Sequence, residues 1–207
     1  MSSRDEILAA VRRNRPSAGA ALPEIPRFPG GDEPVRSHFQ KRLELMGGQS
    51  FVVTDLHAAN ARIAELFPAA GVVCSAVPGI PGTRRIEAVR DPHELRDVDV
   101  GVFRARLGVA EAGAVWVTQD DLVVNALAVL SQHLVVLLDP AAIVRTMHDA
   151  YGRIELAASP YGVFLAGPSA TGDIEGVIIH GAQGARSMTV LLAPGSRPLA
   201  SSLNDPA

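Results

Sequence analysis

Most of the side chains that could perform chemistry lie in one glycine-rich stretch, residues 167–184. Its polar residues are Ser169, Thr171, Asp173, Glu175, His180 and Gln183. Its glycines are Gly167, Gly172, Gly176, Gly181 and Gly184. Glycine lets backbone N–H groups approach a bound anion without a Cβ in between, and apolar, strand-like runs flank the stretch on both sides. We therefore expect an anion-binding turn at the edge of a sheet.

The acids at positions 173 and 175 are open to two interpretations. If Ser169 or Thr171 caps a helix running through Ile174 to Ile179, both acids lie in its first turn, where the helix dipole stabilises them. In the other interpretation Asp173 is a general base or a hydroxyl ligand, with Glu175 supporting it. Ser169 itself lacks the G-x-S-x-G pattern of a nucleophile elbow, so it is better suited to anion binding or helix capping.

A third acid, Glu111, lies close to Gly113 in an otherwise apolar run before a predicted strand. It is either a site residue or the partner of a nearby arginine, such as Arg104 or Arg106. His133 precedes the apolar run 134–138, and it either lines a pocket shared with Glu111 or is a histidine at the edge of the core.

The motifs resemble those of a known family. The run Gly167-Pro-Ser-Ala-Thr-Gly-Asp-Ile-Glu175 resembles the G-P-S-x-T-A/G-D-I-E signature of the LUD-domain family, and residues 180–186 match that family's following glycine turn. A weaker match covers 100–102 and 110–114, and the resemblance extends over about residues 40–193. Threonines of the family pattern are replaced at three positions, Phe103, Ala112 and Ala114.

The resemblance implies a fold like that of the NagB/RpiA/CoA-transferase group and a role in oxidising L-lactate to pyruvate. The chain would be a non-redox, substrate-handling subunit without a cofactor of its own, working with iron–sulfur oxidoreductase partners. Its pocket would bind a small carboxylate or phosphate. Its catalytic residues would be Glu111 and Asp173. Its ligand-binding residues would be Gly113, Gly167, Ser169, Thr171, Glu175, His180, Gly181, Gln183 and Gly184, with Arg186 adding positive charge.

Two alternatives remain open. The chain could be a stand-alone enzyme of the CoA-transferase or isomerase type, in which Glu111 or Asp173 is the catalytic carboxylate. It could also be a non-catalytic scaffold, because the three replaced threonines remove hydroxyl groups from the predicted site.

Composition excludes several classes of protein. The 207 residues are 47% hydrophobic and 20% charged, as in a globular domain, and the net charge of −3 argues against nucleic-acid binding. The single cysteine, Cys74, excludes an internal disulfide and an iron–sulfur cluster held by this chain alone. The six histidines lack zinc-site spacing, and no G-x-G-x-x-G or Walker motif is present. Without a signal peptide or a membrane-length apolar run, we expect a cytoplasmic protein.

The pattern of elements predicts one α/β domain at 35–194, preceded by a helix and a Pro/Gly-rich linker in 1–34 and followed by a flexible tail at 195–207. The predicted helices cover 3–13, 35–46, 55–67 and 140–151. The predicted strands are 50–54, 71–75, 98–102, 114–118, 134–138, 161–166 and 188–193. Short strands alternating with helices indicate a three-layer α/β/α arrangement around a mostly parallel sheet.

Overall fold

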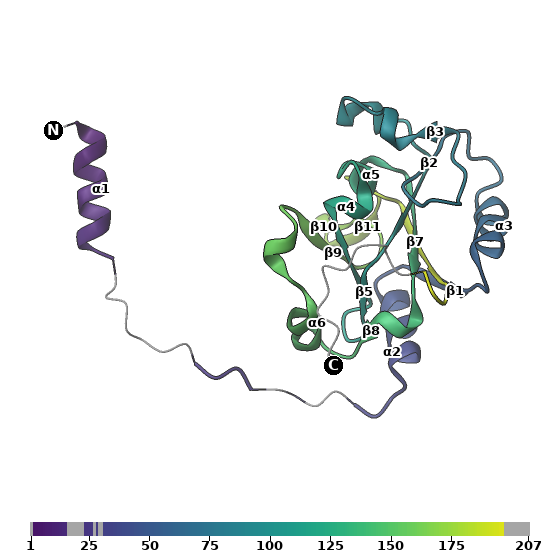
Figure 1. Ribbon diagram of the computed structural model, residues 1–207, viewed down its shortest axis with the longest axis horizontal. Coiled ribbons are helices and arrows are strands. Elements are labelled where there is room, and N and C mark those ends of the chain that lie inside the picture. Colours follow the sequence, from purple (N-terminus) through teal and green to yellow (C-terminus); the bar gives the residue numbers. More distant parts are fainter. Residues whose placement is uncertain (1, 16–22, 27, 29–30, 197–207) are drawn as a thin grey trace.

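Six parallel strands form the central sheet of the protein, which we describe from a computed structural model (Figure 1). Across the sheet their order is β1 (Gln49–Val52), β12 (Ser187–Leu192), β7 (His133–Leu138), β4 (Val100–Arg104), β2 (Val73–Ser75) and β3 (Arg84–Arg85). The structure describes residues 2–15, 23–26, 28 and 31–196. Most of the predicted tail, and the linker residues 16–22, 27, 29 and 30, lie outside this range.

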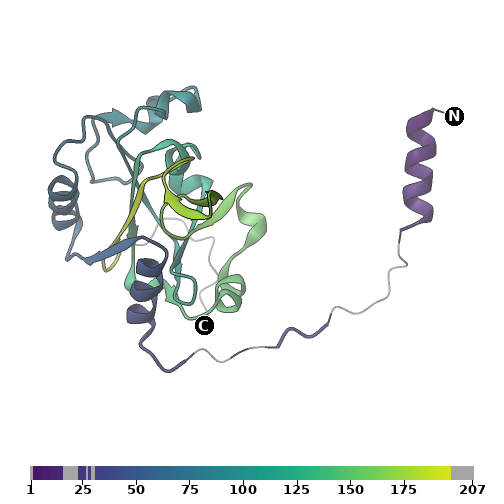
Figure 2. The same cartoon turned by 180° about the vertical axis from the view of Figure 1, so that it is seen from behind.

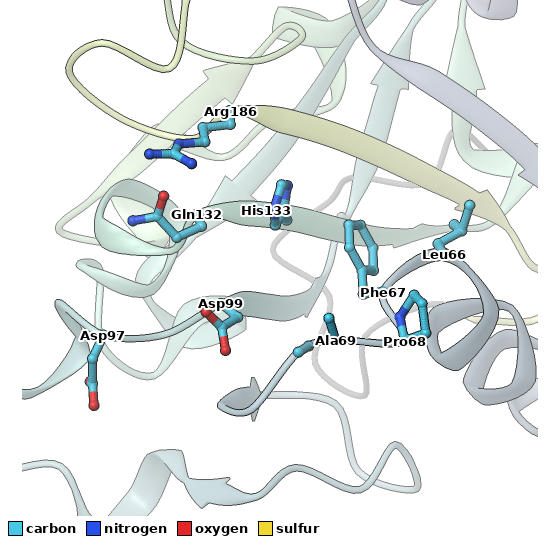
Figure 3. Close-up of a pocket in the computed structure, with 10 residues that line it drawn as sticks. Leu66, Phe67, Pro68, Ala69, Asp97, Asp99, Gln132, His133 and Arg186 are labelled. Carbon is cyan, nitrogen blue, oxygen red and sulfur yellow. The ribbon is translucent and has the colours of Figure 1, made fainter.

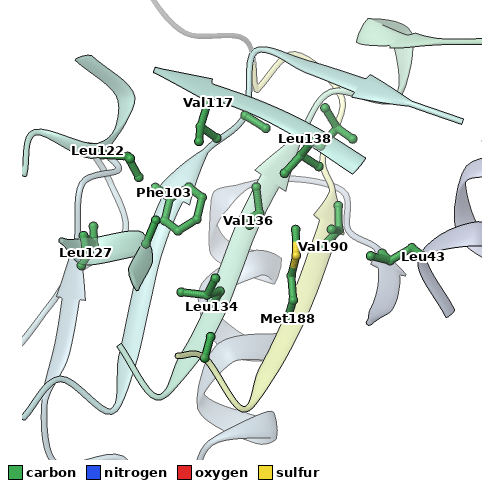
Figure 4. Close-up of a cluster of buried hydrophobic side chains, with 14 of the residues drawn as sticks. Leu43, Phe103, Val117, Leu122, Leu127, Leu134, Val136, Leu138, Met188 and Val190 are labelled. Carbon is green, nitrogen blue, oxygen red and sulfur yellow. The ribbon is translucent and has the colours of Figure 1, made fainter. Parts of the chain in front are cut away.

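Both faces of the central sheet are covered, as the continuous apolar strand sequences predict. Along β7, Leu134, Val136 and Leu138 face one apolar cluster while Val135 and Leu137 face another. The first cluster contains residues of α2 (Val35–Leu45), α4 (Gln119–Leu122) and α5 (Leu127–Leu130), and Figure 4 shows its core. The second contains residues of α3 (Leu56–Leu66). The predicted α/β class, with a mainly parallel sheet flanked by helices, is confirmed.

Local sequence explains where the long helices begin and end. The Asp55 carboxylate accepts a hydrogen bond from the Ala58 N–H at 2.8 Å and caps α3, which stops before Pro68. After α2, Gly47 adopts a φ of +83°, the left-handed conformation that glycine permits. The N-terminal helix α1 spans Ser3–Arg13 as predicted (Figures 1 and 2).

A second, four-stranded sheet was not predicted, and the strands expected at 114–118 and 161–166 belong to it and not to the central sheet. Its order is β8 (Ile143–Val144), β5 (Leu107–Val109), β6 (Ala114–Thr118) and β9 (Gly162–Leu165). β5 and β6 are antiparallel because the turn between them is only four residues long, whereas parallel neighbours require a long crossover. Gly113, with a φ of +60°, completes that turn.

The predicted helix at 140–151 is also wrong in part. Asp139 caps only a short 3₁₀ helix, Pro140–Ala142, and the β-branched pair Ile143–Val144 then joins β5 as strand β8. Thr146 begins a new capping box, and the helix that follows is α6 (Met147–Arg153). Other 3₁₀ helices lie at Ile86–Ala88, Pro92–Leu95 and Leu156–Ala158.

The acid-bearing motif forms a β-hairpin, so of the two interpretations of the acids at 173 and 175, the one that places them in a capped helix does not hold. Strands β10 (Ala170–Ile174) and β11 (Val177–His180) are antiparallel and are joined by a two-residue turn. Glu175 and Gly176 have φ angles of +53° and +72°, which is the signature of a type I′ turn. The β-branched run at 177–179 favours a strand over a helix.

Within the part of the chain that the structure describes, no helix combines the length and apolar character needed to cross a bilayer.

Candidate functional site

Three residues form a polar row across the amino-terminal edge of the central sheet. Val100, His133 and Ser187 begin three adjacent strands and lie in register. The residues directly before them, Asp99, Gln132 and Arg186, therefore form the row. The Asp99 carbonyl accepts from the His133 N–H at 2.9 Å, and the Gln132 carbonyl accepts from the Arg186 N–H at 2.7 Å. Since neighbouring strands lie about 4.8 Å apart, an anion, an amide and a cation follow one another over about 10 Å.

The polar row borders an open pocket of about 650 Å³ (Figure 3). The other wall is the end of α3 and the residues after it, where Pro68 turns the chain away. The lining residues are Leu66, Phe67, Pro68, Ala69, Ala70, Asp97, Asp99, Gln132, His133 and Arg186. A pocket of this size is within the range that binds small molecules.

His133 lies between the two walls of the pocket. Its Nδ1 is 2.8 Å from the Ser187 hydroxyl, and its ring centroid is 5.0 Å from that of Phe67. Burial lowers the pKa of His133 below its usual value, the nearby Arg186 cation lowers it further, and Asp99 opposes the shift. The imidazole can therefore accept or donate one hydrogen bond at neutral pH.

Arg186 is the available cation of the pocket. Its guanidinium makes no ion pair or hydrogen bond with any residue in the described ranges. The acids of the pocket are already engaged, since Asp99 Oδ2 accepts from the N–H groups of Gly71 and Val72 at 2.8 Å each and Asp97 pairs with Arg84. The pocket can therefore accept an anion at its Arg186 end.

The glycine-rich motif holds Arg186 in place. The Ser169 carbonyl accepts from the Gly181 N–H at 2.8 Å, and the Ser169 N–H donates to the Ala185 carbonyl at 2.9 Å. A Cβ on Gly181 would lie 2.5 Å from Cγ of Arg186, and one on Gly184 would lie 2.9 Å from Cβ of Ser169. The predicted ligand-binding residues 169, 181 and 184 thus build the turn that presents the arginine.

Glu111 is bonded within the fold. Its Oε1 accepts from the Met147 N–H at 2.6 Å, at the start of α6, and its carbonyl accepts from Nε of Arg42 at 2.8 Å. The suggested arginine partners are bonded elsewhere: Arg106 pairs with the buried Asp121 at 2.6 Å, and Arg104 donates to the Ser196 carbonyl at 2.9 Å. Gly113 lies against α2, where a Cβ would be 2.3 Å from the Leu43 nitrogen.

The hairpin acids lie in solvent. Asp173 and Glu175 are exposed, and the Asp173 carboxylate bonds only weakly, at 3.3 Å, to the Thr171 hydroxyl. His180 and Gln183 are also exposed. Gly167 lies against the end of α2, where a Cβ would be 2.2 Å from the Met46 carbonyl oxygen, and His180 lies beside Gly47.

The motifs at 110–113 and 167–180 therefore both contact α2, but neither Glu111 nor Asp173 lines the pocket. Their catalytic roles stay predictions. Among the described residues, no group of three or more His, Cys, Asp or Glu side chains is arranged to hold a metal ion.

Sequence reasoning drew attention to His133 and Arg186 but missed Phe67, Asp99 and Gln132. One signal was available: Asp99, Gln132 and Arg186 each lie one or two residues before an apolar strand. Because such residues gather at one edge of a parallel sheet, they are candidates for a shared site.

Comparison with known proteins agrees with this architecture. The LUD domain matches residues 36–193. The crystal structure of a DUF162 family protein from Deinococcus radiodurans is similar, with 18% sequence identity and a TM-score of 0.61 over 77% of this chain and 96% of that chain. No curated protein matches the chain. Since the domain match covers most of the sequence, the chain belongs to the LUD-domain family.

Proposed function

We propose that this LUD-domain chain is a non-redox, substrate-handling component of an L-lactate oxidation system, similar in role to lactate utilization protein C. It holds the carboxylate of a 2-hydroxy or 2-oxo acid in the pocket at the amino-terminal edge of the sheet. The observation that carries the proposal is the available Arg186 guanidinium, which borders the same pocket as Gln132 and His133.

The pocket residues suit such an acid. A guanidinium can donate two parallel hydrogen bonds to one carboxylate, which fixes the orientation of the ligand. The Gln132 amide follows Arg186 in the polar row, where it can accept from a 2-hydroxyl group or donate to a 2-oxo group. His133 offers a further uncharged nitrogen. The pocket therefore provides complementary groups for both members of the lactate/pyruvate pair.

Electron transfer is assigned to partner proteins. Oxidation of a 2-hydroxy acid to a 2-oxo acid releases two electrons and two protons, which require an acceptor. The chain has one cysteine, too few for an iron–sulfur cluster of its own, and burial raises the pKa of Cys74 to about 11. We propose that iron–sulfur oxidoreductase subunits bind this protein and accept the electrons.

Binding of the acid tests the pocket assignment. We expect L-lactate and pyruvate to raise the melting temperature of the protein and to bind in calorimetry. Arg186→Gln should raise the Kd at least about tenfold, because a hydrogen bond to a charged group contributes about 1.5–3 kcal/mol. The matched control is Arg36→Gln, an exposed arginine outside the pocket. No binding to the wild type, or equal affinity in the Arg186 variant, would contradict the assignment.

Titration of His133 tests the same geometry without a ligand. NMR should give a His133 pKa below about 6.5, and Arg186→Gln should raise it, because the variant removes a nearby cation. Since the folded state disfavours protonation, the wild type should lose stability relative to His133→Gln as the pH falls below about 6.5. If Arg186→Gln leaves the His133 pKa unchanged, the two side chains do not interact, and the proposed geometry of the pocket is contradicted.

The partner assignment needs its own experiment. The tagged chain, purified from its native cells without harsh salt, should carry other subunits with bound iron and acid-labile sulfide. A preparation that contains this chain alone under every salt condition would contradict the partner proposal, and it would leave the binding data unaffected.

A further inference from the structure

The two ends of the pocket differ sharply in chemistry. Figure 3 shows Arg186 and Gln132 at one end, Phe67 and Leu66 at the other, and His133 between them. The apolar end is a continuous segment, residues 66–70, that contains no polar side chain. A ligand held by Arg186 therefore meets hydrogen-bonding groups first and an apolar surface beyond His133.

The aromatic ring of Phe67 is partly exposed at this apolar end. It lies with its centroid 5.0 Å from the His133 ring, at an interplanar angle of 33°. The residues after it, Pro68, Ala69 and Ala70, have small or rigid side chains that leave space beside the ring. A flat or branched apolar group could thus lie on Phe67 without displacing a polar partner.

The volume also exceeds what lactate needs. Pockets of roughly 300–1,000 Å³ enclose drug-sized molecules, and this one measures about 650 Å³. A three-carbon acid paired with Arg186 would occupy only the polar end. The apolar end would then remain in contact with water, which gives no affinity.

We infer that the pocket prefers 2-hydroxy or 2-oxo acids with a larger apolar side chain, aromatic or branched, over lactate itself. The carboxylate pairs with Arg186, the 2-oxygen bonds to Gln132, and the side chain lies against Phe67 and the segment after it. This inference rests on the proposed function, because it keeps the same anion site and extends the substrate class.

The test compares the Kd values of L-lactate, pyruvate, L-3-phenyllactate and phenylpyruvate in calorimetry. We expect phenyllactate to bind at least about tenfold more tightly than lactate, as an added apolar group in a matching pocket commonly provides. Phe67→Ala should remove most of that advantage, so that in this variant the Kd of phenyllactate approaches that of lactate. Arg186→Gln should weaken both acids.

Two further variants make the result specific. Phe67→Leu keeps apolar bulk beside His133 and should retain part of the preference, so a loss caused by misfolding is distinguishable from the loss of the ring. Tyr151→Ala truncates an exposed aromatic residue of α6, outside the pocket, and should change neither Kd.

The outcomes separate the inference from the proposed function. If lactate and pyruvate bind and the aromatic acids bind no more tightly, the inference is overturned and the proposed function stands. If phenyllactate binds through Arg186 and Phe67 while lactate does not, the inference stands and lactate is excluded as the substrate. If no acid binds, both fail.

Discussion

The turn at 110–113 and the β10–β11 hairpin both carry an acid and a glycine with positive φ, yet they lie in opposite environments. In the turn, Glu111 caps α6 and Gly113 lies against α2. In the hairpin, Glu175 and Gly176 form an exposed type I′ turn, and a Cβ on Gly176 would meet no described atom within 4 Å. The first motif holds elements of the fold together, whereas the second projects into solvent.

The comparison shows that a chemically suitable residue type does not by itself make a functional site. The Glu111 carboxylate already accepts a backbone hydrogen bond, and the Asp173 carboxylate lies exposed outside the pocket. Arg186 differs from both, because it lines a pocket and its guanidinium donors are not bonded to any described residue. Function is therefore best sought where polar groups border a cavity and still lack partners.

The largest expected effect is the loss of stability on replacing Gly113, compared with Gly176. Gly113→Ala should lower the free energy of unfolding by about 2–5 kcal/mol, because left-handed strain adds to a clash with the α2 backbone. The matched variant Gly176→Ala has the same strain and no clash, so it should lose only about 1–2 kcal/mol. Urea denaturation measures both. Equal losses would show that the turn at 110–113 is no more confined than the hairpin.

The two acids should differ by a smaller amount. Glu111→Ala removes the acceptor at the start of α6 and should cost about 1 kcal/mol, whereas Asp173→Ala should change stability by less than about 0.5 kcal/mol. Calorimetry with L-lactate should give the wild-type Kd for both variants. A loss of lactate binding in Glu111→Gln, with unchanged stability, would instead support the catalytic role predicted from the sequence.

The fold class was predictable because the apolar runs are short and separated by well-marked helix caps. Asp55 and Thr146 both act as caps, but only the first was recognised as the start of a full helix. The second sheet was not predicted, since the local pattern of 114–118 is the same in either sheet. Sheet membership depends on the tight turn before it, and so on the conformation of Gly113.

The candidate site was predictable only in part. His133 and Arg186 stood out by residue type, and the glycines around position 181 proved to shape the turn that holds the arginine. Asp99 and Gln132 join them because β4, β7 and β12 start at the same level, a register that no single segment encodes. Phe67 joins them because α3 stops there, at the far side of the pocket.

The smallest expected effect concerns the hairpin turn. Glu175 has a φ of +53°, a conformation in which asparagine is favoured over glutamate, and Asn-Gly is a preferred type I′ pair. Glu175→Asn should therefore stabilise the hairpin by about 0.5 kcal/mol. Since such a hairpin can open locally, slower hydrogen exchange of its own amides is the direct measurement. Glu175→Val, which places a β-branched residue at positive φ, should have the opposite effect. Both variants remove the same charge, so lactate affinity should be equal in the two. If both instead weakened lactate binding, the hairpin acid would belong to the ligand site, and the contrast between an exposed hairpin and the pocket would fail.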